Sequence, residues 1–265
     1  MTTTETPAAP AHSGIRRVAT ASAIGCTIEW YDFFLYNTFA ALVFNKLFFP
    51  SFDPLVGTML AYATALVGFI ARPIAGILFG HFGDRIGRKK MLILTLLIMG
   101  IGTFLIGLLP TYESIGVWAA ALLLVLRVAQ GLGVGGEWGG AVLMAVEHAP
   151  AGRRGFYGSW PQMGVPAGLA LATGMVALFS SLPGDMFLQW AWRIPFLLSI
   201  VMVAIGLWIR LGISETPVFQ RILDEERAIL LQVLAELDRL TGRDPLMNVV
   251  KQFHLVAQLG SQVLE

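Results

Sequence analysis

Gly80-His81-Phe82-Gly83-Asp84-Arg85-Ile86-Gly87-Arg88-Lys89-Lys90 is a short charged stretch that separates two long apolar runs of the chain. One acid and four bases cannot lie in hydrocarbon, so the stretch marks a point where the chain meets water. Its three glycines predict a tight turn at which two helix ends approach each other closely. A basic loop that only orients the protein is the simpler interpretation, but it leaves the acid and the glycine spacing unexplained.

The composition is that of an integral membrane protein. Of the 265 residues, 56% are hydrophobic and 13% are charged, whereas soluble domains carry about 25% charged residues. The formal net charge of +1 predicts no nucleic-acid partner. The single cysteine, Cys26, excludes an intramolecular disulfide, and the four histidines are not at metal-ligand spacing. We therefore expect no metal, no cofactor and no enzyme chemistry.

Six apolar segments are long enough to cross a bilayer, which takes about 20 residues for a core of about 30 Å. They are predicted at residues 18–45, 55–80, 91–109, 114–140, 155–182 and 191–211. With their connections they form an expected all-α, six-helix transmembrane bundle over residues 16–213. Residues 1–15 are polar and lack the apolar core of a signal peptide, so they predict a disordered tail.

Basic residues alternate from one loop to the next. Arg16 and Arg17 precede the first span, residues 85–90 join the second and third, and Arg153 and Arg154 join the fourth and fifth. The loops on the other side hold few charges. By the positive-inside rule, both termini are predicted to be cytoplasmic, in a plasma (inner) membrane.

Residues 214–265 differ in character from the spans. Apolar residues at 222, 223, 229, 230, 233, 234 and 237 share one helical face, and Gly242 ends this helix before Asp244-Pro245 begins another. The segment is too polar for a seventh span. We expect a cytoplasmic helical hairpin or a helix pair bound at the membrane surface.

Ionisable residues inside the spans are the first candidates for function, because each costs a few kcal/mol in hydrocarbon. Glu29, Asp32 and Tyr36 share one face of the first span. At about 1.5 Å per residue, Glu29 and Asp32 lie about 18 and 22 Å into the core, and Arg127 lies about 21 Å in from the other side. These charges are expected to pair if spans one and four pack together. A buried ion pair that only sets helix register is the alternative.

Three further charged residues are candidates for a gate. Glu137 and Glu147 lie near the cytoplasmic end of the fourth span, where a gate ion pair and simple solvation are alternatives. Arg72, in the second span, is expected instead to anchor a helix end by reaching the interface. The glycines around Glu137 resemble a phosphate loop only superficially, since no strand precedes them. They are expected to let the fourth span pack tightly against a neighbour.

Several of these motifs resemble those of a known superfamily. Residues 80–90 resemble the loop between helices two and three of the major facilitator superfamily, and Arg127-Val128-Ala129-Gln130-Gly131-Leu132-Gly133 is similar to its fourth-helix motif. The metabolite:proton symporter family within it is matched from about Arg16 to Gln220. The motifs that resemble this family in particular are Glu29-Trp30-Tyr31-Asp32-Phe33, Gly135-Gly136-Glu137-Trp138-Gly139-Gly140, Trp192-Arg193-Ile194-Pro195-Phe196 and Glu215-Thr216-Pro217.

The resemblance implies a proton-coupled carrier for a small organic metabolite of the carboxylate or betaine/proline type. Glu29 or Asp32 would carry the proton under the influence of Arg127, in a pathway that includes Tyr36 and Gln130. The solute would bind between two six-helix bundles near the midplane. Asp84 would latch the loop to the other bundle, together with the remaining motif residues Gly80, Gly83, Arg85, Gly87, Arg88 and Lys89.

A full carrier of this family has twelve spans, and only six are predicted here. We expect either a half-carrier that dimerises or pairs with a missing C-terminal half, or a truncated or fused bundle that does not transport. In the second case, which is favoured over a working homodimer, the tail would mediate assembly or partner binding. A channel built from several copies has little support. The solute stays open, because Arg127 would suit a carboxylate, whereas Glu29 and Asp32 would suit a quaternary amine.

Overall fold

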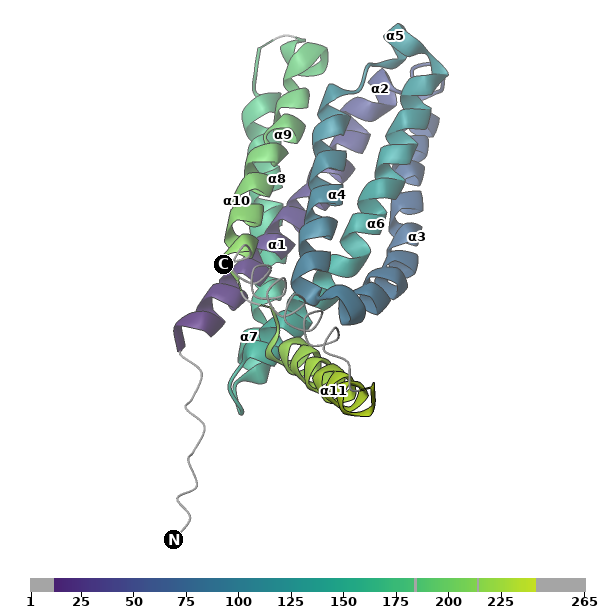
Figure 1. The fold of residues 1–265 in the computed structure, drawn as a ribbon. Coiled ribbons are helices and arrows are strands. Elements are labelled where there is room, and N and C mark those ends of the chain that lie inside the picture. Colours follow the sequence, from purple (N-terminus) through teal and green to yellow (C-terminus); the bar gives the residue numbers. More distant parts are fainter. Residues whose placement is uncertain (1–11, 184, 214, 242–265) are drawn as a thin grey trace. The chain divides into compact units, whose positions relative to one another are not determined.

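The computed structural model of the chain describes residues 12–183, 185–213 and 215–241. Within these ranges the regular structure is entirely helical. The chain divides into two compact units, Met1–Thr216 and Pro217–Glu265, which are described separately. Figure 1 shows the first unit as a bundle of long helices that run up and down. The predicted all-α bundle of six crossing segments is confirmed.

Six helical segments make up this bundle. The first is α1 (His12–Phe39), which continues through a π-helical turn (Ala40–Phe44) into α2 (Asn45–Leu47). The next three are α3 (Pro54–Ile86), α4 (Arg88–Leu108) and α6 (Val117–His148), with the short α5 (Tyr112–Ile115) before α6. The fifth combines α7 (Arg154–Gly158), a 3-10 turn (Trp160–Met163) and α8 (Gly164–Ser180). The sixth combines a π-helical turn (Phe187–Ala191), α9 (Arg193–Leu197) and α10 (Ser199–Leu211).

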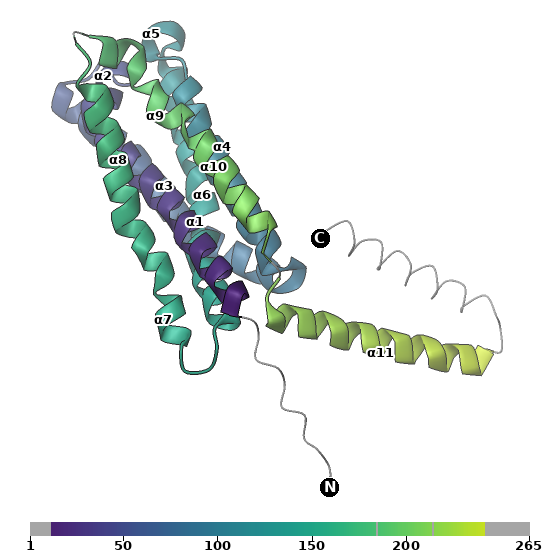
Figure 2. The same cartoon turned by 90° about the vertical axis from the view of Figure 1, so that its left-hand side faces the viewer.

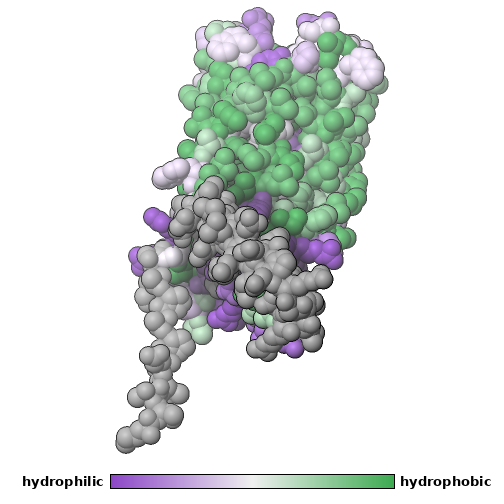
Figure 3. All heavy atoms as spheres, viewed as in Figure 1, coloured by the Kyte–Doolittle hydropathy of each residue, from purple (hydrophilic) through white to green (hydrophobic). Residues whose placement is uncertain are grey.

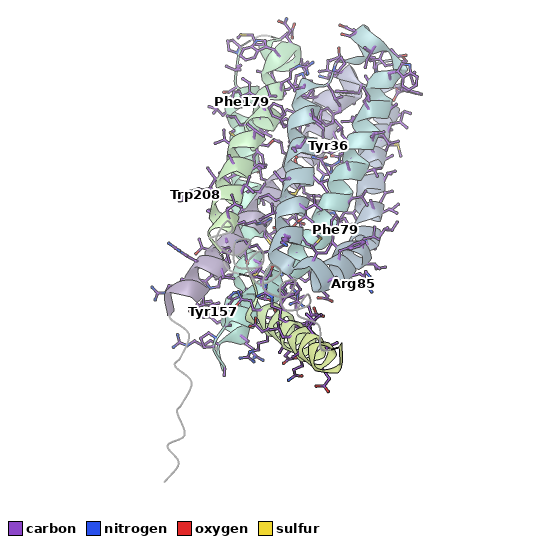
Figure 4. The ribbon with its side chains drawn as sticks, in the orientation of Figure 1. Tyr36, Phe79, Arg85, Tyr157, Phe179 and Trp208 are labelled. Atoms are coloured by element: carbon purple, nitrogen blue, oxygen red, sulfur yellow. The ribbon has the colours of Figure 1, made fainter. Side chains whose placement is uncertain are left out.

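Five of these segments are long and apolar enough to cross a membrane: Pro54–Ile86, Arg88–Leu108, Val117–His148, Arg154–Ser180 and Phe187–Leu211. The first segment carries two acids, and it packs against α6 and α8 inside the same bundle (Figure 2). Figure 3 shows a broad apolar band around the middle of the bundle, with polar residues toward its ends. Ile77 and Trp208 are 76% and 77% exposed, and Figure 4 shows Trp208 pointing away from α10. Such faces suit hydrocarbon or another bundle.

The connection between α3 and α4 is tighter than the sequence predicts. Helix α3 begins at Pro54. Asp53 caps it, because the Asp53 carboxylate accepts a hydrogen bond from the Leu55 N–H at 2.9 Å. It stays helical through Ile86, and α4 begins two residues later. The break is Gly87 alone, at φ +112°, a conformation that favours glycine. The prediction of a turn over residues 80–90 is therefore wrong about its length, because the break is confined to Gly87.

Close contacts between helices depend on glycine. A Cβ atom on Gly131 of α6 would overlap the backbone of Gly68 in α3, and one on Gly68 would lie 2.7 Å from the Arg127 carbonyl oxygen. A Cβ on Gly168 of α8 would lie 2.6 Å from the Tyr31 backbone nitrogen. Small residues of this kind let helix backbones approach in membranes. The predicted packing role of the glycines in residues 131–140 is confirmed, although Gly139 faces open space.

The core is aromatic at the end of the bundle away from Gly87. Phe44 and Phe196 are fully buried, with ring centroids 5.8 Å apart. Next to them, Arg193 of α9 donates hydrogen bonds to the carbonyl oxygens of Gly107 at 2.9 Å and Leu109 at 2.6 Å. Those carbonyls have no helical partner at the C-terminus of α4, so Arg193 satisfies them.

The chain outside the spans differs in part from the prediction. Because α1 begins at His12, residues 12–15 are helical rather than part of the disordered tail predicted over 1–15. Residues 1–11 lie outside the described residues. The second unit contains α11 (Pro217–Thr241), the amphipathic helix expected near residues 221–240. The second helix, expected after Gly242, lies outside the described residues.

Candidate functional site

Two acids and two arginines meet in the interior of the bundle. Glu29 and Asp32 come from α1, Arg72 from α3 and Arg127 from α6. The side chain of Arg72 is 19% exposed, and the other three are 6% exposed or less. They line a cavity of about 10 Å³, which is about the room that one water needs.

Asp32 is the centre of a hydrogen-bond network that joins three helices. Its Oδ1 accepts from the Thr103 hydroxyl of α4 at 2.5 Å, and its Oδ2 accepts from the Gln130 amide of α6 at 2.8 Å. Arg127 donates to Gln130 Oε1 at 2.7 Å and lies 3.9 Å from Asp32 Oδ2. The predicted pairing between spans one and four is thus confirmed for Asp32 and Arg127.

Tyr36 completes the surroundings of Arg127. The guanidinium carbon of Arg127 lies 3.7 Å from the centroid of the Tyr36 ring, within cation–π range. The Tyr36 hydroxyl is 2.5 Å from Thr64 Oγ1, and Thr64 donates in turn to the Ala61 carbonyl oxygen at 2.6 Å. The Tyr36 hydroxyl is therefore the donor to Thr64. Figure 4 shows Tyr36 within the bundle.

Glu29 and Arg72 form a looser pair. Glu29 Oε1 lies 3.8 Å from Arg72 NH1, beyond hydrogen-bond distance. Glu29 Oε2 and Arg72 Nε are buried without a hydrogen-bond partner in the described part of the chain. The guanidinium lies 4.5 Å from the Phe69 ring centroid and 5.5 Å from that of Phe33. The prediction that Arg72 anchors a helix end is wrong, because it lies well inside α3 and points toward α1.

The three residues proposed for a gate lie in three different places. Glu137 is buried in an ion pair with Arg210 of α10, and it accepts from the Thr95 hydroxyl at 3.1 Å. Arg210 also donates to the Leu92 carbonyl oxygen of α4. Arg210 was not identified as a site residue from the sequence. An arginine at the end of an apolar run looks like an ordinary interface charge.

Glu147, the remaining gate candidate, lies at the charged end of the bundle, where Figure 4 labels Arg85. Arg88 pairs with Glu147 of α6 and lies 3.2 Å from Asp84. The backbone N–H of Lys89 donates to Glu215 Oε1 at 3.1 Å, which caps the start of α4. A cavity of about 250 Å³ adjoins this cluster, and its walls include Gly76, Gly80, Gly83, Gly135, Gly136, Gly139 and Gly140.

Apolar helices with buried charges between them define the first unit as a multi-pass membrane bundle. The chain belongs to the sugar (and other) transporter family, whose model matches residues 18–256. This confirms the resemblance to transporters of the major facilitator superfamily. The match continues past Gln220, where the resemblance was expected to end.

Relatives and solved structures agree with this family. The chain is 53% identical to the shikimate transporter of Escherichia coli, over 79% of this chain and 48% of the relative. It is 51% identical to a putative metabolite transport protein of Haemophilus influenzae, over 84% of this chain and 50% of the relative. It is 45% identical to the proline/betaine transporter of E. coli, over 80% of this chain and 42% of the relative. The chain thus spans about half the length of the curated relatives it matches. The inward-open xylose transporter XylE of E. coli shares the fold, with a TM-score of 0.66 at 19% identity over 92% of this chain and 56% of that one. These are membrane carriers rather than enzymes.

Proposed function

We propose that this bundle is one half of a secondary carrier that moves a small carboxylate-bearing metabolite together with protons. The names of its relatives support the solute class: shikimate, proline and betaine each carry a carboxylate. The similar xylose transporter supports the fold alone. The observation on which the proposal rests is the buried network of Asp32, Gln130 and Arg127.

Asp32 is suited to carry a proton because its charge state and its contacts depend on each other. As a carboxylate it accepts from both Thr103 and Gln130. A proton on Oδ2 would face the Gln130 amide, which is itself a donor, so that contact breaks on protonation. Protonation also removes the charge that Arg127 faces at 3.9 Å. The contact between α1 and α6 therefore changes with each proton. Glu29 is the second candidate proton carrier.

Alternating access by this mechanism uses two bundles that rock against each other. We propose that the second bundle comes from another copy of the chain or from a C-terminal half that these residues do not include. In this assembly Asp84, whose side chain is 70% exposed, would latch the loop to that bundle with the other motif residues of 80–89. The basic end of the bundle would face the cytoplasm of a plasma (inner) membrane.

The proposal is tested with the chain reconstituted in lipid vesicles. Labelled shikimate and glycine betaine are followed in counterflow and in uptake driven by a proton gradient. Asp32→Asn is expected to retain counterflow and lose gradient-driven accumulation, because exchange needs solute binding but accumulation needs a titrating group. Asp185→Asn is the matched control, since this acid is exposed in the loop before the sixth segment. No counterflow of either solute at any pH would refute transport by copies of this chain alone.

The mass of the detergent-solubilised chain shows where a second bundle comes from. Light scattering corrected for bound detergent should give either 28.7 kDa for one chain or twice that mass for a dimer. A dimer means that a second copy supplies the bundle. A monomer that still shows counterflow would contradict the two-bundle mechanism.

A second candidate function is assembly through the tail without transport. It is favoured by α11, on which Ile229, Leu230 and Val233 are 60%, 54% and 51% exposed. An amphipathic helix with such a face stabilises itself by covering it. Deletion of residues 217–265 should then abolish assembly while the six spans still insert. Unchanged assembly after the deletion would exclude this function.

A further inference from the structure

The two arginines of the central cluster differ in what their guanidinium groups contact. Arg127 donates to Gln130, lies against the Tyr36 ring and faces Asp32. Among the described residues Arg72 makes no hydrogen bond, and the acid with which it forms an ion pair, Glu29, is 3.8 Å away. Arg127 NH1 thus already has an acceptor in the proton network, although the Arg127 Nε has no partner among the described residues. No nitrogen of Arg72 has an acceptor there, so its donors can take another one.

Two aromatic rings lie close to the guanidinium of Arg72, whose nitrogens make no hydrogen bond among the described residues. The ring centroids of Phe69 and Phe33 lie 4.5 and 5.5 Å from the guanidinium carbon, and cation–π contacts of this kind stabilise the charge without using its donors. An arginine in an apolar layer without hydrogen bonds is costly. Its planar fork matches a carboxylate, which accepts two parallel N–H bonds.

We propose that Arg72, flanked by Phe33 and Phe69, binds the carboxylate group of the transported solute. This inference rests on the proposed function and assigns its solute-binding residue. The cavity at Arg72 has room for about one water, so it takes a carboxylate oxygen. The rest of the solute lies against the outer side of Phe69, which is 52% exposed.

Glu29 competes with the solute for Arg72. An incoming carboxylate meets the negative charge of Glu29, whose Oε2 has no hydrogen-bond partner in the described residues. The solute therefore binds best when Glu29 is protonated, which links anion binding to proton binding. The charged groups that face Glu29 are Arg72 from α3, Asp32 from its own helix, Glu137 from α6 and Arg210 from α10, with Arg127 of α6 behind Asp32.

The test measures how strongly the chain prefers a carboxylate over its neutral ester. Shikimate, methyl shikimate and glycine betaine are titrated into the full chain in lipid nanodiscs. In the wild-type chain, shikimate is expected to bind more than tenfold tighter than the ester, because hydrogen bonds to a charged group contribute at least that factor. Arg72→Gln should remove this preference. Arg221→Gln, at an exposed position of α11, is the matched control and should keep it.

Two further variants separate binding from damage to the fold. Glu29→Gln should bind shikimate several-fold tighter at neutral pH, a gain that misfolding does not produce. The double variant Glu29→Gln/Arg72→Gln leaves no unpaired charge at this position and should bind shikimate and its ester equally.

The outcomes are distinguishable. A preference for shikimate over its ester that persists in the double variant places the carboxylate elsewhere and overturns the inference alone. Weaker binding in Glu29→Gln also overturns it. If the wild-type chain binds neither shikimate nor glycine betaine, the proposed function fails together with the inference.

Discussion

Replacement of Gly131 by alanine tests whether the contact between α3 and α6 holds the bundle together. The new Cβ would overlap three backbone atoms of Gly68, its carbonyl oxygen, carbonyl carbon and Cα. Backbone atoms in the middle of a helix cannot rotate away as a side chain does. The two helices must therefore separate along the face that carries Arg72 and Arg127.

The size of the effect follows from two opposing terms. Overpacking of a well-packed contact costs about 1–3 kcal/mol, and a backbone clash belongs at the upper end of that range. Alanine in place of glycine within a helix recovers about 1 kcal/mol. The net loss is about 2 kcal/mol. For a chain of this size that corresponds to a fall in Tm of about 4–8 °C.

Gly139→Ala is the matched control. Gly139 lies on the same helix, and a Cβ built on it meets nothing within 4 Å. Only the gain in helix propensity from glycine to alanine then remains, so this variant should be about 1 kcal/mol more stable than the wild type. Thermal unfolding of both variants in the same detergent, followed by circular dichroism, measures the difference. A Gly131→Ala protein as stable as Gly139→Ala would refute the argument.

The remaining predictions concern buried charge and orientation. Arg210→Met should destabilise the bundle by about 3–5 kcal/mol because it leaves Glu137 buried and unpaired, and Arg210→Met/Glu137→Leu should recover most of that loss. Unfolding in detergent measures both, and a double variant as unstable as the single one would contradict the reasoning. Arg153→Cys should react with an impermeant maleimide only from the cytoplasmic side and Ser181→Cys only from the other side, since the native Cys26 is fully buried. Labelling from the reversed sides would show that the proposed orientation is wrong.

Much of the candidate site follows from depth along the helices. Asp32 and Arg127 were expected to meet because both fall in the middle layer when residues are counted from the nearest charged loop. Thr103 and Thr64 were missed, because a threonine in an apolar span costs little and carries no signal of its own. Their hydroxyl groups become important only where packing brings them to Asp32 and Tyr36.

The extent of the charged turn was also misjudged, for a physical reason. Glycine and charge at residues 80–90 favour a turn locally, yet α3 remains helical through Ile86. A helix that has left the hydrocarbon can continue in water, so polarity marks where the membrane ends and not where the helix does. Gly87 ends the helix through its positive φ.

The amino-acid sequence is enough to predict that the chain crosses a membrane as a helical bundle and carries acids and bases in its middle layer. Whether a segment inserts into hydrocarbon depends on its own length and charge, so the spans and their buried charges can be predicted one segment at a time. Which charges meet is visible only in the folded bundle, where Glu29 faces Arg72, Asp32 faces Arg127 and Glu137 pairs with Arg210. Those partners lie on different helices, and the rotation and approach of each helix, set by glycine contacts, decide which charges meet.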